Sequence, residues 1–235
     1  MFRFTTLAIA GLAGLVMAPA VHAADWSGCY AGVNGGYASA NTHLRETSVN
    51  NNPIDFDRGS QVDRGWAFGA QAGCDTLFNQ DWLVGFRGLW DKSDLSGSVL
   101  VGPGDYVEST DHTRINSFAT LVGKLGVLVA PTVQAYAIGG LAWADVDYYG
   151  TVPVDQRVFS GHQNRLGYDV GAGLSVMVAP NWELWGEYDY MNFGTGNVAF
   201  NGEGYNTGVQ LGVDSAQDVH KVLIGINYRF DQPSP

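Results

Sequence analysis

The chain has 235 residues, of which 32 are glycine and 12% are aromatic, and its 12 Lys and Arg against 23 Asp and Glu give a formal net charge of −11 at pH 7. This length suits one sizeable β domain, and the glycine and aromatic content is unlike that of a helical enzyme. An acidic surface repels nucleic-acid phosphates, so we expect no nucleic-acid partner.

The N-terminal segment has the features of an export signal. Arg3 precedes an uninterrupted apolar and small-residue run over 7–17, and 21–23 places small residues at the positions that a signal peptidase reads. A retained membrane helix needs about 20 apolar residues, and this run is short for that. We expect residues 1–23 to be a cleaved signal peptide and residues 24–235 to form one domain.

The rest of the chain has the turn pattern of a barrel. Its most apolar stretch, 118–144, is interrupted by Lys124, Pro131 and Gln134, which fits two strands and a turn better than a helix. Tight turns fall about 50 residues apart, at 79–81, 130–132 and 179–181. The other connections are long and polar, and we expect them to be loops at 39–64, 93–113, 148–163 and 194–217. Short turns at one end and long loops at the other predict an all-β fold, an eight-stranded antiparallel transmembrane β-barrel of the outer-membrane type over residues 24–235.

Alternation of side chains supports the same fold. In 222–230 the residues of one parity are Val, Ile, Ile, Tyr and Phe, whereas Asn227 and Arg229 lie on the other face. A barrel in lipid needs an apolar outward face and tolerates a polar lumen. Segments 82–91, 165–179 and 182–192 repeat the rule, and the register of 133–147 stays open. The expected lumen charges are Asp75, Arg87, Asp91, Lys124, Glu187 and Arg229.

Aromatic residues gather at both ends of the expected strands. We expect one girdle at the turn end and a second near the loop end, where amphipathic rings meet lipid headgroups. The turn-end set is Trp26, Phe78, Trp82, Trp182 and Phe230, and the loop-end set is Trp66, Trp90 and Phe193. A single aromatic residue would fit core packing as well.

Two cysteines enter an oxidising compartment if the chain is exported. Cys29 shares parity with Ala31 and Val33, and Cys74 with Phe68 and Ala72, so both thiols should point outward on adjacent strands. Facing positions bring Cβ atoms to about 4.5–5.5 Å, near what a disulfide requires. We predict a Cys29–Cys74 disulfide, with two unpaired buried thiols as the alternative.

Several motifs resemble the small outer-membrane immunogenic proteins of α-proteobacteria, members of the porin-like, OmpA-type barrel superfamily. They are the segments 24–30 (ADWSGCY), 123–126 (GKLG), 139–143 (GGLAW) and 187–194 (EYDYMNFG). The resemblance implies a location in the cell outer membrane of a Gram-negative bacterium, with outer-membrane lipid and lipopolysaccharide as partners. It also implies that Tyr228 and Phe230 form the signal for the barrel-assembly machinery, although five residues follow Phe230 here.

An eight-stranded barrel is just wide enough for side chains to fill its interior. We therefore expect a structural outer-membrane protein with a filled lumen, whose loops face a host or extracellular ligand. A narrow channel for small solutes is the alternative, as is haemin binding by His43, His112 and His162, which the resemblance also permits. We expect no cofactor and no resident metal.

Two further alternatives fit the sequence less well. A lipid-modifying enzyme needs a nucleophile and a base in contact, and the sequence offers no convincing Ser, His and carboxylate set and no Gly-x-Ser-x-Gly. We therefore expect no enzyme. A soluble eight-stranded carrier would need an apolar interior and a polar exterior, the reverse of this pattern.

Overall fold

The computed structural model describes residues 26–49, 52–101, 109–152, 157–203 and 210–230. The expected signal peptide and the five residues after Phe230 lie outside these ranges. Over the described residues the chain forms eight strands, which are β1 (Gly28–Val49), β2 (Asn52–Leu77), β3 (Trp82–Val101), β4 (Ser109–Ala130), β5 (Val133–Val152), β6 (Arg157–Ala179), β7 (Trp182–Glu203) and β8 (Gln210–Arg229). Within the described ranges no helix has the length and hydropathy that crossing a membrane requires.

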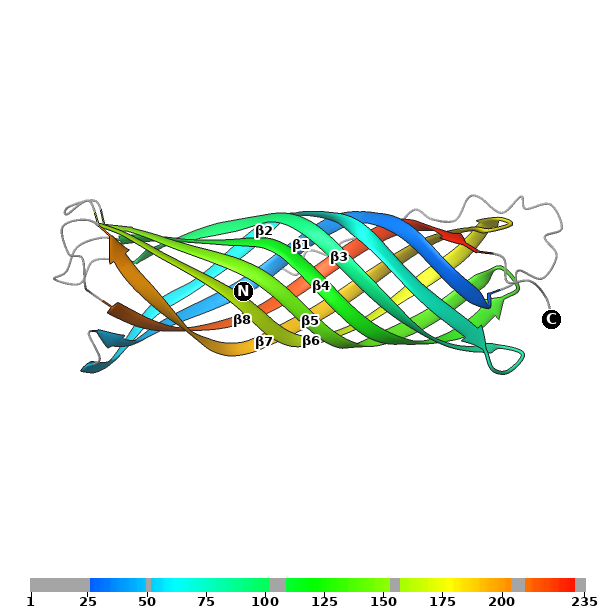
Figure 1. Cartoon of the computed structure of the whole chain (residues 1–235), viewed down its shortest axis with the longest axis horizontal. Coiled ribbons are helices and arrows are strands. Elements are labelled where there is room, and N and C mark those ends of the chain that lie inside the picture. Colours follow the sequence, from blue (N-terminus) through cyan, green and yellow to red (C-terminus); the bar gives the residue numbers. More distant parts are fainter. Residues whose placement is uncertain (1–25, 50–51, 102–108, 153–156, 204–209, 231–235) are drawn as a thin grey trace, which may run out of the picture.

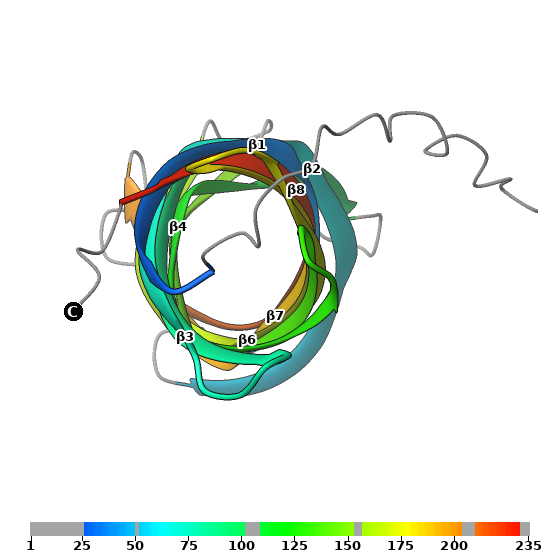
Figure 2. The ribbon, with the colours of Figure 1, turned by 90° about the vertical axis from the view of Figure 1, so that its right-hand side faces the viewer.

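The strands close into one antiparallel barrel in chain order. Each strand pairs with its neighbours in sequence, and β1 pairs with β8 to complete the ring (Figure 2). Short turns join β2 to β3, β4 to β5 and β6 to β7 at the same end of the long barrel (Figure 1). Asn181 in the third of them has a positive φ of 75°, a conformation that Asn tolerates better than most residues. The predicted all-β antiparallel fold is therefore confirmed.

The prediction that 39–64, 93–113, 148–163 and 194–217 are loops is wrong for most of the residues described there. These polar stretches continue the strands in hydrogen-bonded register, as in the pairs Asn41–Val62, Ser98–His112, Tyr149–Ser160 and Asn197–Asp214. Polar composition indicates contact with water, and it does not prevent pairing when a neighbouring strand supplies backbone partners. The strands have 20–26 residues, whereas about 9–11 suffice to cross a bilayer, so the barrel extends well beyond the apolar band.

The register of β5, which the sequence leaves open, is defined by its pairing with β4 and β6 and includes one close contact in the lumen. Tyr136 points into the lumen and lies opposite Gly173 of β6, where a Cβ would come within 2.5 Å of the tyrosine ring. Trp185 lies over Gly225 of β8 in the same way. Large rings fit into this narrow interior because the facing strand has no side chain at that point. On the outer face of β5, Leu141 and Trp143 are exposed.

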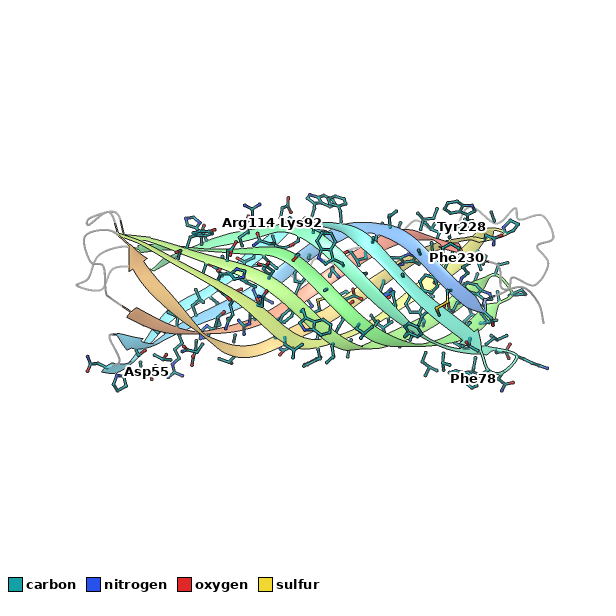
Figure 3. All side chains as sticks on the ribbon, in the orientation of Figure 1. Asp55, Phe78, Lys92, Arg114, Tyr228 and Phe230 are labelled. Carbon is teal, nitrogen blue, oxygen red and sulfur yellow. A yellow bond between two sulfur atoms is a disulfide. The ribbon has the colours of Figure 1, made fainter. Side chains whose placement is uncertain are left out.

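The outer face carries the expected apolar surface, including most of the aromatic residues assigned to the girdles. Six of those eight are exposed, namely Phe78, Trp82, Trp182 and Phe230 near the turns and Trp66 and Trp90 near the loops. Figure 3 shows Phe78 and Phe230 toward the turn end and Asp55 at the opposite end.

Two girdle assignments are wrong, because Trp26 and Phe193 are buried, with 1% and 5% of their surface exposed. Trp26 lies in the lumen and donates a hydrogen bond from Nε1 to the Pro131 carbonyl, 3.1 Å away. Phe193 packs into an apolar cluster inside the barrel. Its parity in β7 is that of Glu187, so strict alternation would have placed it inward.

The two cysteines face each other across β1 and β2 and form a disulfide. Their neighbours of the same parity, Val33 and Phe68, are exposed on the outer face. The disulfide therefore joins two adjacent strands near the turn end, and the structure does not support the alternative of two free thiols among the described residues.

Candidate functional site

The lumen is the first candidate site, and its turn end contains a buried cluster around Arg229. This guanidinium donates to Glu183 Oε2 at 2.9 Å, to Asp75 Oδ2 at 2.7 Å and to the Trp26 carbonyl at 2.7 Å. Lys124 Nζ lies 3.0 Å from the same Asp75 oxygen. Four strands and the segment before β1 thus meet in one buried network. Trp26 covers Arg229, whose Cζ lies 5.3 Å from the centroid of its ring.

The next layer contains an ion pair that crosses the barrel. Arg87 on β3 donates through both terminal nitrogens to the two carboxylate oxygens of Glu187 on β7, with one contact of 3.0 Å. The two strands are half a turn of the ring apart, so the pair spans the lumen. A bidentate Arg–carboxylate pair has a defined geometry as well as favourable energy. Trp185 packs beside it, with its ring centroid 5.5 Å from the guanidinium carbon.

Acidic residues outnumber basic residues in the next layer of the lumen toward the loops. Lys221 is fully buried and lies 2.8 Å from Asp91 and 3.6 Å from Asp189. Asp169 is also buried, and its carboxylate has no hydrogen-bond partner among the described residues. Lys221 is therefore the one described base in a layer that contains three buried carboxylates, Asp91, Asp169 and Asp189.

The lumen is not uniformly polar, which corrects the expected inward face. Toward the loops it holds an apolar cluster with members on six strands, including Leu95, Ile115, Phe118, Met191 and Val219. A barrel this narrow packs its interior like a protein core. Polar side chains lie among the members of this cluster, including Asp63, which is paired with Ala40 and accepts hydrogen bonds from Thr42 and Gln61.

The structure places all six sequence-predicted lumen charges inside the barrel and brings them into the networks described above. Strand alternation also predicts an inward position for Arg165, Asp169, Glu183 and Asp189, which are buried although they are not among the six lumen charges, and the functional residue that it does not name is the buried Lys221. The signal for Lys221 was its parity in the last strand, which is that of Arg229.

The three histidines proposed for haemin lie outside the lumen, on strands rather than in loops. His43 on β1 has its Nδ1 2.9 Å from the Ser60 hydroxyl, whereas His112 is on β4 and His162 on β6. All three are exposed. No two of them lie on neighbouring strands, so the described structure does not bring them together into one haem site.

His162 belongs to a polar cluster on the outer face, together with Asp145 and Asp147 of β5. One ligand atom from each residue lies within 4.8 Å of the others, which is close enough to hold a metal ion. The cluster is already satisfied internally, because Asn116 Nδ2 donates to both carboxylates and His162 Nδ1 lies 2.9 Å from Asp147. The hydrogen bond with Asp147 raises the pKa of His162, and those from Asn116 and His162 lower the pKa of Asp147. The cluster ties β4, β5 and β6 together beyond the apolar band.

Comparison with known proteins assigns the chain to a family. Residues 8–230 match the family described as "Outer membrane protein beta-barrel domain". The chain is 25% identical over 210 residues to the 31 kDa outer-membrane immunogenic protein of Brucella melitensis, covering 88% of this chain and 84% of that protein. The corresponding Brucella suis protein matches to the same extent.

Solved structures agree at the level of the fold. The outer membrane protein OprG of Pseudomonas aeruginosa superimposes with a TM-score of 0.54 at 14% identity, covering 89% of this chain and 99% of OprG. The outer membrane protease OmpT of Escherichia coli gives a TM-score of 0.53 at 10% identity, covering 88% and 98% of the two chains. The closed barrel, its apolar outer face and these matches place the protein in the outer membrane of a Gram-negative bacterium. The chain belongs to the outer-membrane β-barrel family.

Proposed function

We propose that the protein is a structural barrel of the outer membrane, with a closed lumen and with its strand extensions and loops presented to the outside. The observation that carries this proposal is the Arg87–Glu187 pair, which joins opposite walls of the barrel. Both side chains are almost completely buried. A lumen bridged in this way leaves little room for a continuous water column.

The packing on either side of this pair supports closure. The Arg229 network fills the turn end, and the apolar cluster fills the section toward the loops. An ion that crossed the barrel would have to leave water at the apolar cluster, and such transfer is costly without compensating partners. We therefore prefer a closed barrel to a narrow channel, and we propose no catalytic role.

The assignment of the two ends follows the pattern of bacterial outer-membrane barrels, in which short turns face the periplasm and longer connections face outside. Under this proposal residues 1–23 are removed on export. The outward Tyr228 and Phe230 at the turn end of β8 serve assembly (Figure 3). The strand extensions then present polar side chains for a host or extracellular ligand.

Single-cysteine labelling on intact cells tests this orientation. The described part of the chain has no free thiol, so an introduced cysteine would be the one reactive group among these residues. Ser60→Cys lies in the exposed extension of β2, and Gln80→Cys lies in the exposed turn before β3. We expect a membrane-impermeant maleimide to label Ser60→Cys on intact cells and Gln80→Cys only after the outer membrane is opened. The reverse pattern would overturn the proposed orientation.

A further inference from the structure

Basic side chains are scarce on the outside of this acidic barrel, and their distribution is uneven. Five of the basic residues with described side chains are buried in the lumen, in a sequence with only 12 Lys and Arg. Of the outward ones, Arg45 is engaged by Asp55, with Nε 2.6 Å from Oδ1. The other three are Arg64, Lys92 and Arg114, and they lie on the consecutive strands β2, β3 and β4.

The register brings Arg64 and Arg114 together and places Lys92 farther along β3, and we call these three residues the basic patch. Arg64 and Arg114 are both paired with Ser96 of β3, one from each side. Adjacent strands are about 4.8 Å apart, so the two arginines leave the barrel wall roughly 10 Å from each other. Lys92 lies on β3 between these strands, four residues from Ser96 toward the apolar band, which is roughly 13 Å along the strand. Figure 3 shows Lys92 and Arg114 on the outside of the barrel. All three side chains are exposed.

The basic patch lies at the border between apolar and polar surface. Arg64 is two positions beyond Trp66 on the same face of β2, and Lys92 is two positions beyond Trp90 on β3. Both tryptophans are more than half exposed, at 55% and 53%. Tryptophan at such a border marks the depth of lipid headgroups. Long basic side chains next to it can keep their stems on the apolar wall and extend the charge to that level.

The cations of the basic patch are available for a ligand. Among the described side chains, none of the three forms an ion pair. Two carboxylates adjoin the basic patch and offset part of its charge. Asp94 lies between Lys92 and Ser96 on the outward face of β3 and accepts a hydrogen bond from the Trp66 backbone N–H at 2.6 Å. Asp147 lies opposite Arg114, which helps to lower its pKa, and is also bonded to Asn116 and His162. Arginine recognises phosphate oxygens through paired N–H groups, and lysine binds them as a point charge.

We propose that Arg64, Lys92 and Arg114 bind the phosphate groups of a phosphorylated glycolipid headgroup in the outer leaflet. A lipid fits better than a soluble anion because the cations adjoin an exposed apolar wall, formed by Phe68, Trp66 and Trp90, along which acyl chains can pack. This inference rests on the proposed orientation, because only that orientation places the basic patch in the outer leaflet. Binding of the lipid in detergent does not depend on orientation, so the lipid site and the orientation can be disproved separately.

The test uses the folded full-length protein in detergent micelles, with native mass spectrometry to count bound diphosphorylated lipid A. The variants are R64Q/K92Q/R114Q and the single Arg114→Gln, with Arg45→Gln as the matched control because it also removes an exposed outward charge. Each basic residue near an anionic lipid surface contributes a factor of about five in affinity, so the triple variant should bind roughly a hundredfold more weakly. Arg114→Gln should lose about fivefold and Arg45→Gln almost nothing.

Two comparison ligands distinguish a phosphorylated lipid from other possible ligands. Lipid A without its phosphates should bind the wild type as weakly as intact lipid A binds the triple variant, and millimolar inorganic phosphate should not displace intact lipid A. Heat-modifiable electrophoresis confirms that each variant is folded before it is compared. Equal binding by the wild type and the triple variant, or equal binding of phosphorylated and dephosphorylated lipid, would overturn the proposal. Full displacement by inorganic phosphate would overturn the lipid as the ligand.

Discussion

Removing either partner of the Arg87–Glu187 pair should destabilise the barrel strongly, whereas removing both should not. In Arg87→Met the Glu187 carboxylate loses a bidentate partner in a site where both side chains are at most 3% exposed. Breaking a buried pair in this way costs about 3–5 kcal/mol, while replacing both partners by apolar residues of similar volume is often close to neutral. We expect the same loss in Glu187→Leu, and a double variant R87M/E187L far more stable than the sum of the single changes.

The assay is equilibrium urea unfolding of the full chain in lipid vesicles, followed by tryptophan fluorescence, with all four proteins compared as a double-mutant cycle. The cycle isolates the pairwise free energy because the contact with Trp185 is lost in each variant that lacks Arg87. Single variants that cost less than about 1 kcal/mol each, or costs that simply add, would refute the inference that this pair bridges the lumen.

Two other predictions concern the lumen wall and the outer face. Gly225→Ala should destabilise the barrel by about 1–3 kcal/mol, because the added Cβ would collide with the Trp185 ring. The control in the same unfolding assay is Gly139→Ala, where no atom lies within 4 Å of the added Cβ. Equal destabilisation by the two substitutions would contradict the packing of Trp185 against Gly225. The His162 imidazole should titrate by NMR with a midpoint above its ordinary 6.5 and closer to 6.5 in Asp147→Asn, since Asp147 stabilises the protonated ring. The stability that His162 contributes is then complete below pH 6.5 and is lost as the pH rises through the raised pKa; a wild-type midpoint at or below 6.5 would exclude the interaction.

Alternation in the sequence was enough to predict which faces of most strands meet lipid. It worked where the outward residues are large and apolar, as in β8, where Val222 and Ile224 are exposed and Lys221 and Leu223 are buried. It left β5 open because small and aromatic residues occupy both faces. There the inward Tyr136 fits against Gly173 of the neighbouring strand, a contact that the sequence of β5 alone does not contain.

The other differences have equally local causes. The position of Trp26 at the turn end of the first strand predicts a place in the girdle. Its ring instead covers Arg229 inside the barrel, and its indole N–H donates a hydrogen bond to the Pro131 carbonyl. The polar segments resemble loops in sequence because their amino-acid composition indicates only contact with water. Whether such a segment forms a strand depends on the backbone hydrogen bonds that the adjacent strand offers. The sequence predicts a filled lumen but only charged and polar filling, because strand alternation contrasts an apolar outside with a polar inside, and it does not predict the apolar cluster around Phe118.

The closed lumen is the central claim, and single-channel recording in planar bilayers tests it most directly. Wild-type protein that is shown to be folded and inserted by heat-modifiable electrophoresis should give no regular conductance steps, because charge pairs and an apolar cluster fill the barrel in series. Steps of constant size in most insertions of the wild-type protein would contradict the account and establish the narrow channel instead.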